Sequence, residues 1–368
     1  MRVGIDITDL ATGIVGVGSV ILNQLCYLNQ HDIKNEYFLY QNDEKDYCSG
    51  VNFHKRRACL PSYAYLREQV YFSSRAVIDN LDIFHAPIHL PPKILSSRTK
   101  VVMTVHDLHV ELDKNGMYSD SMRKYFVPRR VKAISDADAV IVHSNKVKND
   151  VLSLCGISKE KIHCFPLGIK QEFLKKFSNE DLINIRHKYN LPEKYILFVG
   201  SVEPWKRCSF LIEAFKKFRN KNNINLVIIG RKGGSNKECD FVEAAVNNNA
   251  DIHWLESVAS EDLPLIYKNA LLFTSASIFE GVGMIFLEAM AQGIPVIGAN
   301  AAAIPETIGD AGLIFNPDDV DDLVNKFNLV LENDLMYDDL SDKALRRSTK
   351  FSWDDYGKNI FQLYEKMM

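Results

Sequence analysis

The sequence predicts an α/β protein with two doubly wound parallel sheets, arranged as two domains in tandem. Short apolar runs, typical of buried strands, alternate along the chain with helical patterns, as they do in parallel sheets covered by helices. The alternation stops in a polar stretch after Gly168 and restarts at Tyr195, and the length of 368 residues fits two domains. We place the boundary near residue 172, which gives an N-terminal domain of residues 1–172 and a C-terminal domain of residues 173–353.

Six strands are expected in the N-terminal half. The first is followed by a loop, residues 12–18, whose glycine spacing is G-x-x-G-x-G and which opens a helix that continues through Leu28. Further helical stretches are expected from about Tyr63 to Asp79 and, with a basic composition, around residues 121–135. The expected strands are residues 2–7, 36–40, 82–85, 101–105, 139–142 and 161–165.

Five strands are expected in the C-terminal half, at residues 195–200, 225–230, 252–255, 271–274 and 295–298. Helical patterns occupy residues 208–219, 238–247 and 261–269. A further helix, residues 284–292, is closed by Gly293 as a C′ glycine, with Pro295 two residues beyond. The last segment, residues 353–368, carries apolar residues at helical spacing and is expected to be an amphipathic helix.

Composition and charge argue against several classes of protein. Hydrophobic residues make up 46% and charged residues 25% of the chain, the ordinary globular balance, and the net charge of −3 argues against a dedicated nucleic-acid binder. No run of 18 apolar residues occurs and the N-terminus lacks a signal-peptide core, so we expect a cytoplasmic protein. The seven cysteines are dispersed without a C-x-x-C pair, which indicates reduced thiols rather than a zinc site.

The stretch from Leu272 to Asn300 carries the pattern that points to chemistry. Glu280 follows a strand, the loop Gly281-Val282-Gly283 opens a helix at Met284, and Glu288 lies about one turn inside that helix. Helix N-termini bind anions, whereas carboxylates accept hydrogen bonds from hydroxyl groups. One phosphate-binding loop between two carboxylates that accept hydrogen bonds from hydroxyl groups fits a nucleotide diphosphate-sugar, which has a diphosphate between a sugar and a ribose.

This stretch resembles the E-x7-E motif of the retaining glycosyltransferases of family four, which adopt the GT-B fold: two tandem Rossmann-like domains whose parallel sheets face a cleft. The flanking text EGVG…LEAMAQGIPVI is similar to that family's EGFG…LEAMACGTPVI, although Met284-Ile285 replaces the usual Leu-Pro. The resemblance implies that Glu280 contacts hydroxyls of the donor sugar, that Glu288 holds the ribose, and that Gly281, Val282, Gly283 and Met284 border the donor. It also implies that a C-terminal helix, residues 354–368, crosses back onto the N-terminal domain.

A second stretch, Gly200 to Arg207, lies at the carboxyl end of the first strand of the C-terminal half, where ligands of open α/β sheets gather. The family commonly shows G-R-x-x-E-P-R-K here, with its Arg and Lys on the diphosphate. Glu203-Pro204 and Lys206 match this pattern, while Ser201 and Trp205 replace the two arginines. We expect Lys206 and Arg207 to neutralise the diphosphate.

Other site candidates lie outside these two stretches. His106 ends a buried strand, and the resemblance implies that it faces the donor sugar. Gly16, in the loop at residues 12–18, and Arg231, in a basic glycine loop after the strand at residues 225–230, are included as donor-binding candidates, with a flexible loop as the alternative for Arg231. His85, which also ends a strand, is kept as a candidate for contact with ligand, whereas Asp107 and His109 are not favoured.

The pair Asp136 and Asp138 has the D-x-D spacing of a divalent metal clamp, but the phrase around it resembles a turn before a strand, so we expect no metal. Between Val51 and Lys132 the chain has 14 Lys and Arg against 7 Asp and Glu, an excess of +7, with Tyr125 and Phe126 among the cations. This composition suits an anionic membrane surface, and a solvated face is the alternative.

We therefore expect a retaining glycosyltransferase that moves a hexose, with mannose from GDP-mannose as the leading candidate, to a glycan or lipid-linked acceptor in surface polysaccharide biosynthesis. No cofactor, metal or nucleic acid is expected, and the protein would act in the cytoplasm at the inner face of the membrane. One alternative is a catalytically inactive GT-B paralogue that serves as a binding protein, which the departures at Ser201 and Trp205 favour. A nicotinamide-dependent dehydrogenase is a further alternative, weakened because the glycine spacing differs from G-x-G-x-x-G.

Overall fold

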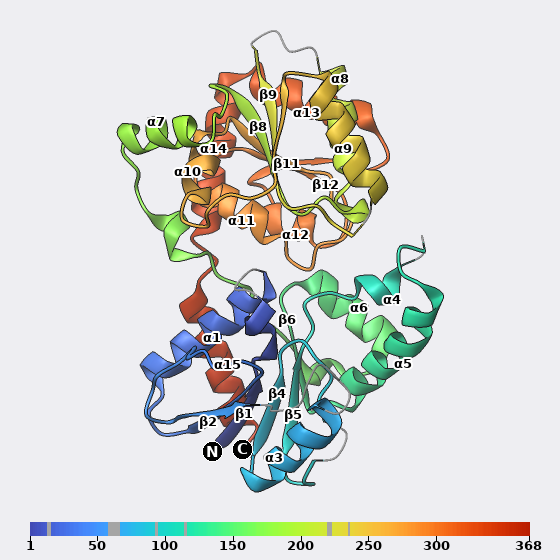
Figure 1. The fold of residues 1–368 in the computed structure, drawn as a ribbon, viewed down its shortest axis with the longest axis vertical. Helices are drawn as coiled ribbons and strands as arrows, with labels where there is room; N and C mark the ends of the chain where they lie inside the picture. Colours follow the sequence, from blue (N-terminus) through green and yellow to red (C-terminus); the bar gives the residue numbers. More distant parts are fainter. Residues whose placement is uncertain (13–15, 58–66, 93–94, 114–115, 219–222, 235) are drawn as a thin grey trace. The chain divides into compact units, whose positions relative to one another are not determined.

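The structure, a computed structural model, describes residues 1–12, 16–57, 67–92, 95–113, 116–218, 223–234 and 236–368. These residues form two compact units: Met1–Gly168 with Ser352–Met368, and Ile169–Phe351. Each unit is a parallel sheet covered by helices (Figure 1), so the α/β fold class with two parallel sheets is confirmed. Among the described residues, no helix combines the length and the apolar character that crossing a bilayer requires.

The first unit has a seven-stranded sheet in the order β3-β2-β1-β4-β5-β6-β7, and all paired strands are parallel. The order reverses between β1 and β4, so the loops that follow these two strands diverge at this point. Strand β3 was not anticipated, because its sequence FHKRR is polar and half-exposed at a sheet edge. The strands are β1 Arg2–Asp6, β2 Glu36–Gln41, β3 Phe53–Arg57, β4 Ile83–Ala86, β5 Lys100–Thr104, β6 Ala139–Val142 and β7 Ile162–Cys164.

The helices of the first unit include the expected basic helix, α5, and a helix after the first strand, α1. Residues 13–15 of the expected glycine loop and residues 63–66 of the expected helix lie outside the described residues. Serine side chains cap α5 and α6, through Ser119 and Ser144. The bounds are η1 Thr8–Thr12, α1 Val17–His31, η2 Arg67–Phe72, α3 Ser73–Ile78, α4 His109–Leu112, α5 Asp120–Asp136, α6 Asn145–Cys155, η3 Lys159–Lys161 and α15 Trp353–Lys366.

The C-terminal helix α15 packs against α1 within the first unit. At their contact a Cβ on Gly357 would lie 2.2 Å from the Tyr27 ring, so only glycine permits this approach. The Tyr364 hydroxyl lies 2.6 Å from Nδ1 of His85, whose Nε2 lies 2.8 Å from the Thr104 hydroxyl. His85 is fully buried, so its interpretation as a ligand-contact candidate is wrong: it anchors α15.

The second unit has a six-stranded parallel sheet in the order β10-β9-β8-β11-β12-β13. Its order reverses between β8 and β11, and ligands of open α/β sheets bind beyond the carboxyl ends of strands at such a point. Sequence reasoning missed the last strand, β13. The strands are β8 Tyr195–Val199, β9 Asn225–Ile229, β10 Ile252–Leu255, β11 Leu272–Ser275, β12 Val296–Ala299 and β13 Gly312–Phe315.

The helices of the second unit include the expected helix after the glycine loop, α11, which ends one residue early at Ala291. Gly293 has a φ of +68°, the left-handed conformation expected of a C′ glycine. The bounds are η4 Gln171–Leu174, α7 Asn179–Lys188, η5 Pro204–Lys206, α8 Cys208–Lys217, α9 Asn236–Asn248, α10 Leu263–Asn269, α11 Met284–Ala291, α12 Ile304–Ile308, α13 Val320–Leu331 and α14 Asp334–Ser348.

Candidate active site

The loops that follow β8 and β11 meet where the strand order of the second unit reverses. Lys206 is the last residue of η5, in the loop that follows β8, and Glu280 lies in the loop that follows β11. The Lys206 Nζ lies 2.5 Å from Glu280 Oε1, and the two side chains are only 15% and 14% exposed. A backbone hydrogen bond from Ile278 N to Trp205 O, 2.9 Å long, also joins the loops. Two of the predicted catalytic residues therefore form one shielded ion pair at the edge where ligands bind.

The glycine loop beyond Glu280 ends in a backbone conformation that only glycine adopts without strain. Gly283 has a φ of +83° and begins α11 at Met284. Two hydrogen bonds from α12 and its N-cap residue hold this loop in place. Ala303 N donates to Glu280 O over 3.2 Å, and the Thr307 hydroxyl donates to Val282 O. The first N–H groups of a helix have no partner within the helix and favour an anion there. The start of α11 is therefore held beside the ion pair in a fixed geometry.

Glu288, one turn inside α11, is only 6% exposed. The Tyr267 hydroxyl donates to its Oε2 over 3.3 Å, and the Lys170 ammonium lies 3.5 Å from Oε1. Burial raises the pKa of this carboxyl group, Lys170 and Tyr267 oppose the rise, and Glu172 adds to it. Sequence reasoning missed Lys170 and Tyr267. Lys170 lay in the polar stretch taken as a domain boundary, and Tyr267 lay in a helix with no signal of its own.

Arg207 points elsewhere. It has a φ of +51° at the start of α8, and its guanidinium donates to Pro317 O over 2.5 Å and lies 4.6 Å from the centre of the Phe210 ring. The structure thus places Arg207 against the segment before α13 and does not bring it together with Lys206 and Glu280. Its left-handed backbone, which no sequence pattern signalled, turns the side chain away.

The loop after β9, which contains Arg231, is attached to the β8 loop. A Cβ on Gly230 would lie 1.9 Å from Gly200 O, so the two loops approach as closely as glycine allows. Glu203 accepts a 2.9 Å hydrogen bond from Gly234 N, and Val202 N donates to Arg231 O over 3.0 Å. Glu203 therefore orders the basic loop, while the Arg231 side chain is exposed.

In the first unit, Gly16 and His106 both follow carboxyl ends of strands. Gly16 has a φ of +55°, is exposed and precedes α1. His106 donates from Nε2 to Pro87 O over 3.0 Å, and its Nδ1 lies 3.1 Å from Nε2 of His143. Burial lowers the pKa of His106 to about 4, so its imidazole is neutral at pH 7. Asp107 and His109 pair with each other, which makes them a local structural contact.

The basic residues between Val51 and Lys132 do not form one face. Lys55, Arg56 and Arg57 lie on the edge strand β3 and pair with carboxylates, whereas the remaining cluster lies on α5, which joins β5 to β6 near the other edge of the sheet. Asp136 pairs with Lys132, and Asp138 accepts from Val101 N. Across the described part of the chain, no three His, Cys, Asp or Glu side chains cluster as metal ligands would.

Comparisons with known proteins cover both halves of the chain. Residues 14–173 match the family model of glycosyltransferase family 4, and residues 179–347 match that of glycosyl transferases group 1. The chain is 25% identical over 287 residues to O-antigen chain mannosyltransferase B of Escherichia coli, covering 77% of this chain and 74% of the relative. It is 27% identical over 259 residues to the serotype-specific mannosyltransferase WbdA of Escherichia coli, covering 69% of this chain but only 32% of that longer protein.

Solved structures share the fold over the whole chain. A glycosyltransferase from Rickettsia africae superposes with a TM-score of 0.75 at 19% identity, covering 100% of this chain and 98% of that one.

Proposed function

The chain belongs to the GT-B glycosyltransferases, and from this premise we propose that it is a retaining hexosyltransferase which moves mannose from GDP-mannose to a glycan or lipid-linked acceptor. The names of the relatives support mannose as the sugar and surface polysaccharide as the product, since both are mannosyltransferases and one acts on the O-antigen chain. Two glycosyltransferase family models argue against the nicotinamide-dependent dehydrogenase considered from the sequence.

The observation that carries the proposal is the ion pair of Lys206 and Glu280 at the reversal of the strand order. A diphosphate placed there would meet the Lys206 ammonium and the N-terminus of α11, and both stabilise the negative charge that grows as the donor bond breaks. Glu280 would exchange part of its contact with Lys206 for hydroxyls of the sugar. In the free protein each residue neutralises the other, which keeps both ordered in a partly buried place.

The proposed reaction breaks the bond between the anomeric carbon and the phosphate oxygen and forms a bond from the acceptor oxygen to the same face of that carbon. The leaving phosphate oxygen takes the proton of the acceptor hydroxyl. A covalent intermediate on the protein is disfavoured in this proposal, because Glu280 is assigned to hydroxyls of the sugar and Glu288, which is buried against Tyr267, to the ribose. Retention then follows from attack on the face that the leaving group vacates.

Glu288 would accept hydrogen bonds from the ribose, as the E-x7-E resemblance implies. This role requires an ionised carboxylate despite its burial, which the neighbouring Lys170 supports. His106 is neutral at pH 7, so it contributes no positive charge against a diphosphate.

Thermal-shift measurements with GDP-mannose, UDP-glucose and dTDP-glucose test the proposal. A ligand at 100 times its Kd stabilises a protein by roughly 2.7 kcal/mol, so the true donor should stand out. We expect GDP-mannose to raise the unfolding temperature most and to be hydrolysed slowly without acceptor. Stabilisation without any hydrolysis or transfer would favour the inactive paralogue, and no response to any nucleotide-sugar would refute the proposed donor site.

A further inference from the structure

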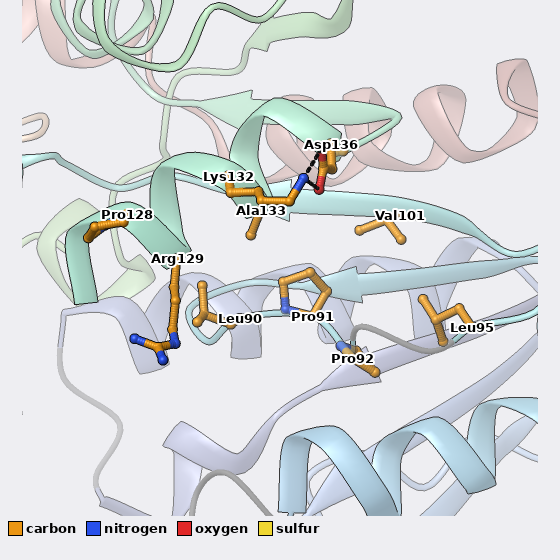
Figure 2. A pocket seen from close by; sticks show the side chains of 11 residues that line it. Leu90, Pro91, Pro92, Leu95, Val101, Pro128, Arg129, Lys132, Ala133 and Asp136 are labelled. Carbon is orange, nitrogen blue, oxygen red and sulfur yellow. Dashed lines mark hydrogen bonds and ion pairs between the residues drawn. The ribbon is translucent and has the colours of Figure 1, made fainter. Parts of the chain in front are cut away.

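An open cavity of about 750 Å³ lies in the first unit between α5 and the segment that joins β4 to β5. Figure 2 shows Leu90, Pro91 and Leu95 of that segment beneath α5, with Val101 of β5 beside them. Most of its lining is apolar, and its volume lies within the range of roughly 300–1,000 Å³ typical of sites for small organic molecules.

The helix that borders this cavity is unusually poorly buried. Ile134 is the single buried residue among the 17 of α5, while Met122 and Tyr125 are 43% and 56% exposed. Helices of this length in soluble proteins are stabilised mainly by burying an apolar face. Met122, Tyr125, Arg129 and Lys132 follow one another at spacings of three and four residues, so they share one face of α5. This face therefore presents apolar and cationic side chains beside an apolar cavity.

The cations at the cavity suit a phosphate group. Arg129 donates to Tyr125 O over 2.6 Å and lies 3.5 Å from the centre of the Tyr125 ring, and no carboxylate of the described residues pairs with it. Lys132 pairs with Asp136 over 2.8 Å (Figure 2), but these side chains are 75% and 60% exposed, and exposed pairs contribute little and open easily. One guanidinium group can bind two oxygens of a phosphate at once, through two parallel N–H donors.

We propose that this cavity takes one acyl chain of an anionic membrane phospholipid, with the lipid phosphate on Arg129 and Lys132, and so holds the first unit at a bilayer surface. The cavity reaches Val101 and Ala137, at the amino ends of β5 and β6. Gly16 and His106 follow carboxyl ends of strands, at the opposite edge of the sheet. The lipid is therefore an anchor distinct from the acceptor, and the inference does not rest on the proposed transfer reaction.

Soluble alkyl phosphates below their micelle concentrations test the chain and the head group separately. Calorimetry should show affinity that rises about fourfold per added methylene, until the cavity is filled. Inorganic phosphate alone should show no measurable binding. Octyl maltoside, which has a chain but no phosphate, should bind at least tenfold more weakly than octyl phosphate. Affinity independent of chain length, or equal affinity for octyl maltoside, would overturn the proposal.

Substitutions localise the site. Ala133→Trp should fill the cavity and abolish the dependence on chain length, and the smaller Ala133→Leu should only shorten the chain at which affinity stops rising. Arg129→Gln should weaken the binding of dodecyl phosphate about tenfold. Lys124 is an exposed cation of the same helix that does not line the cavity, so Lys124→Gln should leave this binding unchanged.

In flotation assays, phosphatidylglycerol vesicles should bind the protein and phosphatidylcholine vesicles should not. Vesicle binding that survives Ala133→Trp and Ala133→Leu undiminished would refute the cavity as the anchor.

Discussion

The ammonium group of Lys170 lies 3.5 Å from a carboxylate oxygen of Glu288, and both residues belong to the second unit. Lys170 stands at the start of this unit, on the segment that leads into η4, and Gln292 of the α11 terminus donates to Phe173 O over 2.6 Å. The segment is therefore fastened to α11 at two points. Since burial raises the pKa of Glu288 and Lys170 opposes the rise, Lys170 supports the ionised form that a ribose contact requires.

Replacing Lys170 should shift the pH dependence of nucleotide binding. In Lys170→Met the pKa of Glu288 should rise further, so protonation of this carboxylate should weaken GDP binding at a higher pH than in the wild type. The loss should recover as pH is raised, because Glu288 then ionises. Calorimetric titration with GDP between pH 6 and pH 9 measures this, and Lys170→Arg should behave as wild type. Lys268→Met is the matched control, since Lys268 donates to Gln292 O. An equal loss at every pH would show that Lys170 acts only in packing.

Substitution of Glu288 and substitution of Glu280 should affect the binding of different parts of the donor. Ribose contacts persist through the reaction, and a hydrogen bond to a charged group is worth roughly 1.5–3 kcal/mol, so Glu288→Gln should weaken GDP and GDP-mannose alike. Glu280→Gln should lower kcat more than it raises KM, because contacts to the sugar tighten as charge develops. It should not weaken bare GDP, since it releases Lys206 from its ion pair. If Glu280→Gln weakens GDP as much as Glu288→Gln does, this assignment of roles is wrong.

Sequence periodicity predicted the sheet and the site loop better than the direction of individual side chains. The strands around Glu280 and Lys206 are apolar runs buried on both faces, and Gly293 ends α11 as a C′ glycine should. The edge strand β3 was missed because a half-exposed strand carrying Lys55, Arg56 and Arg57 has no apolar run. Arg207 was misplaced because its left-handed φ is set by packing of the loop. Lys170 was missed because its partner, Glu288, is 118 residues further along the chain, and periodicity carries no signal of such a long-range contact.

Acid should destabilise the first unit through its buried histidines. Burial lowers the pKa of His85 to about 3 and of His106 to about 4, and also lowers that of His143. The unfolded chain, with histidine pKa values near 6.5, therefore binds more protons below that pH, so stability falls as pH drops from about 7 toward 4. Each buried histidine adds at most about 1.4 kcal/mol per pH unit. Trp353 lies in this unit, so in Trp205→Phe/Trp254→Phe its fluorescence reports urea unfolding of the unit.

In that background His85→Gln should flatten the dependence on pH between 7 and 5, because it removes one of the histidines that take up a proton when the unit unfolds. His31→Gln is the matched control, since His31 ends α1 as an exposed residue. A dependence that is as steep in His85→Gln as in the parent would show that His85 does not contribute.

Chelation should leave transfer unchanged. The charge of the donor diphosphate would be met by Lys206 and the start of α11, and the D-x-D carboxylates are engaged elsewhere, Asp136 with Lys132 and Asp138 with Val101 N. Initial rates with GDP-mannose should therefore be equal with and without EDTA. A rate that EDTA abolishes and manganese or magnesium restores would contradict the proposed metal-independent stabilisation of the leaving group.

Lys206 and Arg207 are adjacent cations with different surroundings, which makes them a matched pair. Lys206→Met should lower kcat by roughly 10²–10³, the effect of removing one group that stabilises charge in the transition state. It should also lower stability, since Glu280 loses its partner in a shielded place. Arg207→Gly should change kcat little, because the guanidinium contacts Pro317 O and the Phe210 ring, while glycine accepts the left-handed φ of +51°. Steady-state kinetics on the two variants decides between them: a loss for Arg207→Gly as large as for Lys206→Met would return Arg207 to the diphosphate site.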